Sequence, residues 1–385
     1  QFNGIFIDKE YLENRSNEIG KKIESLELEI INLAGEEFNL NSSQQLAVIL
    51  FDKLKLPMIK KRSTAEAVLS ELKDKHPLPE LILSYRKLYK LKNTYLDPLP
   101  SYIVADTKRV HSSFNQTMTA TGRLSTSSPN FQNIPIRTED GKEIRKAIKA
   151  QSNEYQIFSA DYSQVELRVM AHLSGDESLI SALNNGEDIH TFTAKNIFNV
   201  DNDDMVLPEM RRIAKIVNFG IMYGAGPFRL SQELDIPFGE AKQIKDAYFQ
   251  KYRGIEQYIE NSKLQIKETK SVETLLGRKR AVWDSDSQNK IRRDAAERMA
   301  INMPIQGTAA EMIKLAMIKI HRQMNKENLK SKLIMQIHDE LLLEVHQDEI
   351  DYISKMVIEH MRNAMKLDVP IEIDFGIGPS WYEAH

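Results

Sequence analysis

Hydrophobic residues recur at helical spacing through the first hundred residues. Between residues 9 and 34 the apolar positions include Ile19, Ile23 and Ile30, and charged residues separate them. This spacing predicts a long amphipathic helix. Gly35 follows it at the place where a helix commonly stops. We therefore expect the N-terminal region to be built mainly from helices.

The pattern then alternates between mixed and helical texture. Thr, Ser, Asn, Gly and Pro dominate residues 108–134, which favours short strands and loops. The apolar run 155–161 predicts a buried strand that leads into a helix starting near Ser163. The other expected elements are a helix with a capping serine in "NLNSSQQL", a helix over about 78–95, helices through 186–302, a helix over about 305–326, a strand pair around 338, a helix over about 348–366 and a short last strand in "IEIDFGIG".

Composition narrows the class of protein. The chain has 385 residues, of which 41% are hydrophobic, enough for a sizeable core and more than one subdomain. No run of about 18 apolar residues occurs, so we expect no membrane span. Cysteine is absent, which excludes disulfides and leaves oxygen or imidazole ligands for any metal. The formal net charge is −3, but basic clusters at 53–62 and 85–95 suit either nucleic acid or a solvated face.

Acidic residues stand at two unusual places. Asp161 ends the predicted strand, and "QIHDELLLEV" places His338, Asp339 and Glu340 between two apolar runs. That second pattern predicts a hairpin whose turn carries the three polar residues. Carboxylates delivered by separate strands to one point would form a Mg²⁺ site. The alternative for a single Asp at a strand end is a cap or turn residue.

A third segment, "EMRRIAKIVNFGIMYGAG", repeats at helical spacing. Arg211, Lys215, Phe219 and Tyr223 recur every four residues and form one stripe on a helix. Such a stripe could hold a triphosphate through its cations and stack a base or sugar on its aromatic rings. The alternative is an ordinary amphipathic helix with a basic edge. The glycines at 220 and 224 are expected to admit a ligand or a bend.

These three segments resemble motifs A, B and C of family A DNA polymerases, the bacterial DNA polymerase I type. The resemblance extends to "TATGRLSTSSPNFQNIPIR", "GEDIHTFTA", "TLLGRKR" and "AERMAINMPIQGTAAEMIK". It implies an α+β right-hand polymerase fold with an antiparallel-sheet palm and helical thumb and fingers. The implied parts are the start of the palm and the thumb at 1–105, the first part of the palm at 106–176, the fingers at 177–301 with the motif B helix at 209–224, and the second part of the palm at 302–385.

The resemblance also implies a role for individual residues. Asp161 and Asp339 match the metal-binding aspartates, with Glu340 as a supporting acid. The implied catalytic residues are Asp161, Asp339, Lys215 and Glu340. The implied nucleotide-binding residues are Arg211, Lys215, Phe219, Tyr223, His190, Glu166 and Gln164, and Glu166 is expected to close off the sugar 2′ position. The implied DNA-binding residues are Arg123, Asn133, Arg298, Asn302, Gln306, His338, Lys90 and Lys92.

The activity implied by the resemblance is template-directed DNA synthesis in replication or repair. Deoxynucleoside monophosphates would be added to a primer 3′-hydroxyl by two-metal-ion phosphoryl transfer with release of pyrophosphate. The cofactor would be two Mg²⁺ ions, with Mn²⁺ as an alternative. The partners would be primer–template DNA and deoxynucleoside triphosphates, and we expect a monomer inside the cell that does not associate with membranes.

Two other activities would each explain only part of this pattern. A non-catalytic nucleic-acid clamp would not need Asp161 or Asp339, and a metal-dependent nuclease would not need the stripe of Arg211 and Tyr223. Asp8 and Glu10 superficially match an exonuclease motif, but we interpret "IDKEYL" as a turn and a helix start. We therefore expect no proofreading by this chain.

Overall fold

The computed structural model describes residues 1–134 and 139–385. The last three residues of the segment "TATGRLSTSSPNFQNIPIR" lie outside the described residues. The chain divides into two compact units. The first unit comprises residues 1–113, 126–157 and 377–385, and the second comprises residues 114–125 and 158–376.

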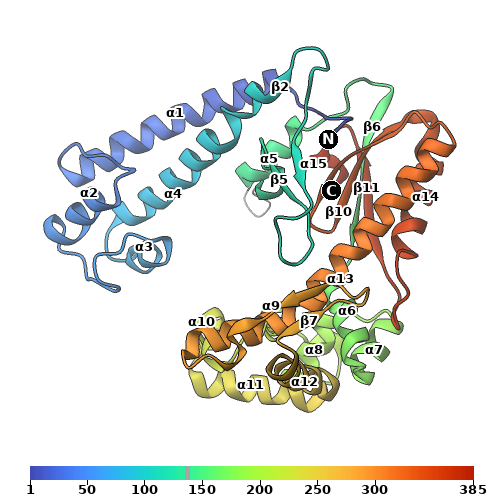
Figure 1. Ribbon diagram of the computed structural model, residues 1–385. Coiled ribbons are helices and arrows are strands. Elements are labelled where there is room, and N and C mark those ends of the chain that lie inside the picture. Colours follow the sequence, from blue (N-terminus) through green and yellow to red (C-terminus); the bar gives the residue numbers. More distant parts are fainter. Residues whose placement is uncertain (135–138) are drawn as a thin grey trace. The chain divides into compact units, whose positions relative to one another are not determined.

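Two long helices run side by side in the first unit, α1 (Lys9–Ala34) and α4 (Pro77–Leu91) (Figure 1). Asp8 caps α1 by accepting a hydrogen bond from the Tyr11 amide, and Gly35 ends it in the left-handed conformation at φ 73°. The predicted helix over 9–34 is therefore confirmed. Its apolar stripe, including the fully buried Ile19 and Ile30, faces the core of this unit.

Shorter elements complete the first unit. Ser42 caps α2 as the sequence predicts. Trp381 is 1% exposed, and the guanidinium of Arg145 lies 4.3 Å from its ring centroid. The elements are β1 (Ile5–Phe6), α2 (Ser43–Ala47), the π-helix η1 (Val48–Lys53), α3 (Glu66–Leu72), the π-helix η2 (Lys92–Leu96), η3 (Leu99–Tyr102), β2 (Ile103–Val104), β3 (Arg109–Val110), η4 (Phe131–Asn133), α5 (Glu139–Ala147) and α15 (Trp381–Ala384), with strand order β1-β3-β2.

A four-stranded sheet, ordered β11-β6-β10-β9, forms the framework of the second unit. Its strands are β6 (Tyr155–Tyr162), β9 (Lys332–Ile337), β10 (Glu340–His346) and β11 (Ile373–Gly378). β9 and β10 form the predicted antiparallel hairpin, in which Glu340 pairs with Ile337. Six successive residues of β10 are buried, so both of its faces are covered. The sheet thus holds the hairpin turn in a fixed position.

Helices make up most of the rest of the second unit, and α14 packs beside the strand β10 (Figure 1). The long helix α13 packs on α6, α12 and α14. The elements are α6 (Val165–Ser174), α7 (Glu177–Asn184), α8 (Ile189–Phe198), η5 (Asp203–Met205), α9 (Pro208–Met222), α10 (Pro227–Leu234), α11 (Phe238–Lys251), α12 (Arg253–Thr269), β7 (Ser271–Glu273), β8 (Lys279–Ala281), η6 (Trp283–Asp286), α13 (Lys290–Lys326), η7 (Gln347–Glu349) and α14 (Ile350–Arg362). The paired strands β4 (Ser113–Asn115) and β5 (Ser125–Ser127) each have residues in both units.

Two sequence predictions need correction in this unit. The helix expected over 305–326 begins much earlier, at Lys290, because Asn289 caps it by accepting hydrogen bonds from two backbone amides. The region 186–302, expected to be helical, contains the antiparallel hairpin of β7 and β8. Its turn uses Gly277 at φ 80°, a conformation that favours glycine.

The central strand β10 generates a stability prediction. Leu341 is 0% exposed in this strand, two residues after Asp339. Leu341→Ala should lower the free energy of unfolding by about 2–5 kcal/mol, because it leaves a cavity in a covered strand. Urea denaturation followed by circular dichroism measures the loss. Leu264→Ala, at a leucine of α12 that is 57% exposed, is the control and should change stability by about 0.5 kcal/mol or less. Equal losses in the two variants would contradict the burial of β10.

Candidate active site

The sheet brings two aspartates to adjoining strand ends. The Tyr162 amide at the end of β6 donates a hydrogen bond of 3.2 Å to the Asp339 carbonyl oxygen in the hairpin turn. Asp161 directly precedes Tyr162, so both acids stand where β6 and β10 are neighbours. The predicted hairpin is confirmed, but its turn consists of His338 and Asp339 alone, with His338 at φ 49°. The expectation that Glu340 also lies in the turn is corrected, because Glu340 pairs with Ile337 as the first residue of β10.

Glu340 has different surroundings from Asp339. It is the first residue of β10, is 5% exposed and accepts a 2.6 Å hydrogen bond from the Ser159 hydroxyl of β6. This contact ties the hairpin to the neighbouring strand. It gives Glu340 a structural role in the sheet beside the two aspartates, and its predicted supporting role in catalysis stays a prediction.

A cluster of charged side chains lies next to Asp339. One guanidinium nitrogen of Arg123 is 2.7 Å from Glu166 and 3.8 Å from Asp339. The Tyr223 hydroxyl donates a hydrogen bond to the other Glu166 oxygen. Burial raises the pKa of Glu166, although Tyr223 and Arg123 lower it. Burial also raises the pKa of Asp339, and the nearby Arg123 guanidinium opposes this shift. The site is thus acidic and incompletely neutralised.

These side chains surround a hollow of about 290 Å³. It brings together predicted metal, nucleotide and DNA ligands that are far apart in sequence. Gln164, at φ 51°, makes the sharp turn between β6 and α6 that places Glu166 in the hollow. The lining residues are Arg123, Tyr162, Gln164, Val165, Glu166, Phe219, Tyr223, His338 and Asp339.

The predicted stripe lies on α9 and ends at its C-cap, Tyr223. The Phe219 and Tyr223 rings are stacked, with centroids 6.4 Å apart. Arg211 forms a two-pronged ion pair with Asp188, at 3.1 and 2.8 Å. Lys215 is exposed and has no acidic partner within the described ranges 1–134 and 139–385. The stripe therefore presents one paired cation, Arg211, and one cation, Lys215, that is free as far as the described residues extend.

The two glycines of this segment serve packing between parts of the chain. A β-carbon at Gly224, which has φ 73°, would come within 2.9 Å of Arg298 on α13. A β-carbon at Gly220 would lie 3.0 Å from Leu230 on α10. Both glycines therefore permit close packing, and the expectation that they admit a ligand stays a prediction. Gly224 does provide the expected change of direction after α9.

Three predicted DNA-binding residues share one face of α13. Arg298, Asn302 and Gln306 are spaced four residues apart, which aligns their side chains along the helix. None of them is fully exposed. The Oδ1 atom of Asn302 is buried and lacks a hydrogen-bond partner among the described residues. Such an acceptor could bond an incoming ligand.

The remaining predicted DNA ligands lie in the first unit. Lys90 is exposed in the last turn of α4, and Asn133 is exposed at the end of η4. The Lys92 ammonium pairs with Asp97 at 2.9 Å. In the basic segment 53–62, Arg62 forms two 2.6 Å bonds with Asp52. Part of the positive charge in these segments is therefore neutralised within the chain.

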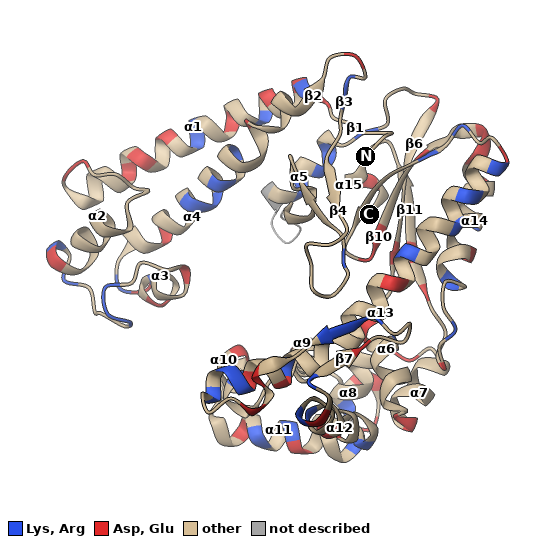
Figure 2. Cartoon of the chain, viewed as in Figure 1, with Lys and Arg blue, Asp and Glu red and all other residues tan. Residues whose placement is uncertain are grey.

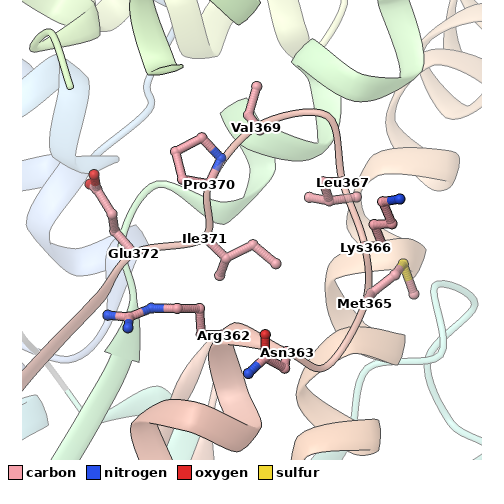
Figure 3. Close-up of a pocket in the computed structure, with 9 residues that line it drawn as sticks. All are labelled: Arg362, Asn363, Met365, Lys366, Leu367, Val369, Pro370, Ile371 and Glu372. Carbon is pink, nitrogen blue, oxygen red and sulfur yellow. The ribbon is translucent and has the colours of Figure 1, made fainter. Parts of the chain in front are cut away.

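Another hollow, of about 650 Å³, lies between the end of α14 and the segment before β11 (Figure 3). Its lining includes Arg362, Lys366 and Glu372. Glu372 is bonded by Arg168 at 2.5 Å, and Arg168 also donates to the Pro370 carbonyl oxygen. These contacts brace the loop before β11, and the hollow holds none of the predicted site residues.

The sequence matches the family described as DNA polymerase family A over residues 9–383. The chain belongs to DNA polymerase family A. It is 49% identical over 387 residues to "DNA polymerase I, thermostable" of Thermus filiformis and 46% identical over 385 residues to "DNA polymerase I" of Bacillus subtilis. Each alignment covers 99% of this chain, but only 46% and 44% of those relatives. The chain thus spans less than half the length of the relatives it matches.

A solved structure supports the same assignment. The POL domain of Pol1 from M. smegmatis, in complex with DNA primer-template and dNTP, matches with a TM-score of 0.94 and 41% sequence identity. The match covers 99% of this chain and 68% of that one. The expected right-hand polymerase fold is confirmed. No helix within 1–134 and 139–385 is long and apolar enough to cross a membrane.

Members of family A generally use divalent metal ions, and the acid pair suits such a cation. The Asp339 carboxylate has no hydrogen-bond donor among the described residues, and a guanidinium nitrogen 3.8 Å away compensates it only in part. No cluster of three or more potential ligands occurs within the described ranges. A cation here would take its other ligands from water and phosphate oxygens, as Mg²⁺ commonly does.

Two residues that organise this candidate site were not predicted from the sequence. Asp188 caps α8 and holds Arg211. Asn218 is buried next to Phe219 and contacts His190. The cap was detectable, because Asp188 precedes Thr191 by three residues at a helix start. A polar residue on the apolar face of α9 was the available signal for Asn218.

His190 generates a pH prediction. It is 3% exposed, and its pKa is lowered to about 4, mainly by burial; Asp188 opposes this shift, and Arg211 and Lys215 contribute to it. The unfolded chain, with a histidine pKa near ~6.5, binds this proton more tightly than the folded chain. Stability should therefore rise with pH between about 4 and 6.5 and level off above, with a contribution on the order of 3 kcal/mol.

Urea denaturation at several pH values tests this dependence. His190→Gln should lose much less stability on acidification than the wild type does. His321→Gln, at an exposed histidine of α13, is the control and should keep the wild-type slope. An unchanged slope in His190→Gln would show that this imidazole is not held neutral by burial.

Proposed function

We propose that this chain is a template-directed DNA polymerase domain that extends a primer 3′-hydroxyl with deoxynucleoside monophosphates. The observation that carries the proposal is the pairing of Asp161 and Asp339 at one edge of the sheet, in the same unit as the cationic and aromatic stripe of α9. Phosphoryl transfer needs positioning and charge neutralisation more than covalent help from the protein. The two features supply both.

The triphosphate would bind at the cationic part of α9. Lys215 is free to neutralise phosphate charge, including that developing on the leaving pyrophosphate. Arg211 would exchange Asp188 for the triphosphate, or share itself between them, because its ion pair is half-exposed and weak. His190 would add a hydrogen bond from the start of α8. These groups would draw the nucleotide toward the acid pair.

Asp161 and Asp339 would hold two Mg²⁺ ions, or Mn²⁺ in their place. When bound, these ions would activate the primer hydroxyl and stabilise the leaving oxygen. Glu340, held by Ser159, would keep the turn that carries Asp339 rigid. Arg123 would limit repulsion between Glu166 and Asp339 while the site is empty of nucleotide.

Sugar selection would depend on Glu166 and Tyr223. Their hydrogen bond fixes the Glu166 side chain at the floor of the hollow. A ribose 2′-hydroxyl would approach this buried carboxylate, whose two oxygens already accept hydrogen bonds from Arg123 and Tyr223. Phe219, stacked on Tyr223, would pack against the sugar. Gln164 lines the same hollow and would help to position the nucleotide.

The proposed ligands of primer–template DNA occur in each of the two units. Arg298, Asn302 and Gln306 on α13, with Arg123 and His338, would meet the duplex near the primer end. Minor-groove contacts of this kind test base-pair shape more than sequence. Basic residues on α4 and the loop after η1 would grip phosphates (Figure 2). The implied ligands in that first unit are Lys90, Lys92 and Asn133.

The proposed division into parts follows the family: palm start and thumb at 1–105, palm at 106–176, fingers at 177–301 and palm at 302–385. We further propose that the chain acts as a monomer inside the cell in replication or repair. Asp8, the residue that superficially matched an exonuclease motif, is engaged as the cap of α1 and by Lys149 at 2.8 Å. Asp8 therefore gives no support for an exonuclease activity of these residues.

Primer extension with Mg²⁺ and deoxynucleotides tests the proposal. Asp161→Asn and Asp339→Asn should each lower the extension rate by about a thousandfold or more, because several kcal/mol of transition-state stabilisation is lost. Binding of primer–template, measured by fluorescence anisotropy, should stay close to the wild type, since phosphate contacts elsewhere supply most of the affinity.

Asp284→Asn is the matched control, because Asp284 is an exposed aspartate of η6. It should extend primers at the wild-type rate. Near-normal extension by either of the first two variants would refute the metal assignment. A wild-type chain that binds DNA without extending it would favour the clamp, and one that shortens the primer would favour the nuclease.

A further inference from the structure

A buried hydrogen-bonded network connects α8 to α9 behind the triphosphate-binding cations. The Asn218 side-chain nitrogen lies 3.1 Å from His190 Nδ1 and 3.1 Å from the Thr193 hydroxyl. The Thr193 hydroxyl is 2.7 Å from the Tyr252 hydroxyl. His190, Thr193, Asn218 and Tyr252 are all at most 3% exposed. Polar groups buried this deeply need partners of matched donor and acceptor type.

His190 enters this network through one ring nitrogen only. Its Nδ1 atom faces Asn218, whereas its Nε2 atom has no hydrogen-bond partner among the described residues. The ring lies 5.7 Å from that of Phe219 on the stripe, and its charge would be repelled by Arg211 and Lys215. Asp188 has the opposite effect and raises the pKa of His190. Burial among these groups keeps the imidazole neutral.

A neutral imidazole carries one proton, so only one of its nitrogens can donate. To bind an anionic phosphate, His190 must donate from Nε2, and Nδ1 must then accept a hydrogen bond. The Asn218 amide nitrogen is placed to donate that bond. The opposite amide orientation would point the Asn218 oxygen at Nδ1 and turn the Nε2 lone pair toward the phosphate.

We propose that Asn218 is a positioning residue that fixes His190 as the Nε2–H tautomer, so that the histidine donates to the triphosphate without carrying a charge. This inference rests on the proposed function for the role of the phosphate, but the tautomer itself is a property of the free chain. Thr193 and Tyr252 hold the Asn218 amide in place from behind, since the hydroxyl of Thr193 bonds both. A neutral histidine donates a hydrogen bond to the triphosphate without adding a positive charge that would repel the Lys215 ammonium.

Asn218→Asp tests the proposal because a carboxylate accepts hydrogen bonds and cannot donate to Nδ1. Long-range proton–nitrogen spectra of the ¹⁵N-histidine-labelled chain distinguish the tautomers, and His190→Gln identifies the signal of His190. The wild type should show Nε2–H. Asn218→Asp should convert His190 to the Nδ1–H form or to the imidazolium. In primer extension its KM for nucleotide should rise about tenfold, with a smaller change in kcat, because one hydrogen bond to a charged group is weakened.

Two other variants separate positioning from packing and from added charge. Asn196→Asp changes the asparagine of α8, whose amide donates to the Phe192 carbonyl oxygen, and should leave the His190 tautomer unchanged. Thr193→Val removes the hydroxyl that holds the Asn218 amide but keeps the amide donor, and it should weaken the preference for Nε2–H less than Asn218→Asp does. Asn218→Leu removes the donor without adding charge and should lose the preference for Nε2–H.

The tautomer assignment and the proposed function can be refuted independently of each other. A wild-type His190 in the Nδ1–H form, or an Asn218→Asp chain that keeps Nε2–H, would overturn the role of Asn218. A wild-type chain that shows Nε2–H but does not extend primers would refute the proposed function and leave the tautomer assignment standing.

Discussion

One backbone hydrogen bond, from the Tyr162 amide to the Asp339 carbonyl oxygen, sets the geometry of the whole site. It joins the end of β6 to the turn that precedes β10, and it thereby makes Asp161 and Asp339 neighbours across 178 positions of sequence. The Ser159–Glu340 bond reinforces the same junction. Two acids held this rigidly beside a buried cluster would repel each other. This repulsion destabilises the site locally, and a bound cation would offset it.

The positively charged side chains near that acid pair in the second unit differ in how far acids already neutralise them. Arg123 is shared between Glu166 and Asp339, Arg211 is occupied by Asp188, and Lys215 is free. His190 contributes a neutral donor, because burial disfavours its protonated form. A triphosphate would therefore meet partners that differ in charge and in how strongly they are already paired. In this account, nucleotide binding rearranges existing ion pairs as much as it forms new ones.

Local patterns in the sequence were sufficient for several of these features. Helical spacing predicted the α1 and α9 helices, and the apolar arms around His338 and Asp339 predicted the hairpin. The adjacency of Asp161 and Asp339 came from family resemblance, since strand pairing over such a distance leaves no periodic trace. Asn218 was missed because its partner His190 lies 28 residues away on another helix. The start of α13 was missed because its Asn289 cap lies in a polar segment without apolar periodicity.

The most direct test of this account is Mn²⁺ binding in the presence of a dideoxy-terminated primer–template and the matching nucleotide. Electron paramagnetic resonance of the free ion gives the bound fraction, after subtraction of the Mn²⁺ held by DNA and nucleotide alone. The account predicts protein-dependent binding that Asp161→Asn and Asp339→Asn each weaken strongly and that Asp284→Asn leaves unchanged. Equal Mn²⁺ binding by the wild type and Asp339→Asn would contradict the claim that the paired strand ends form the metal site.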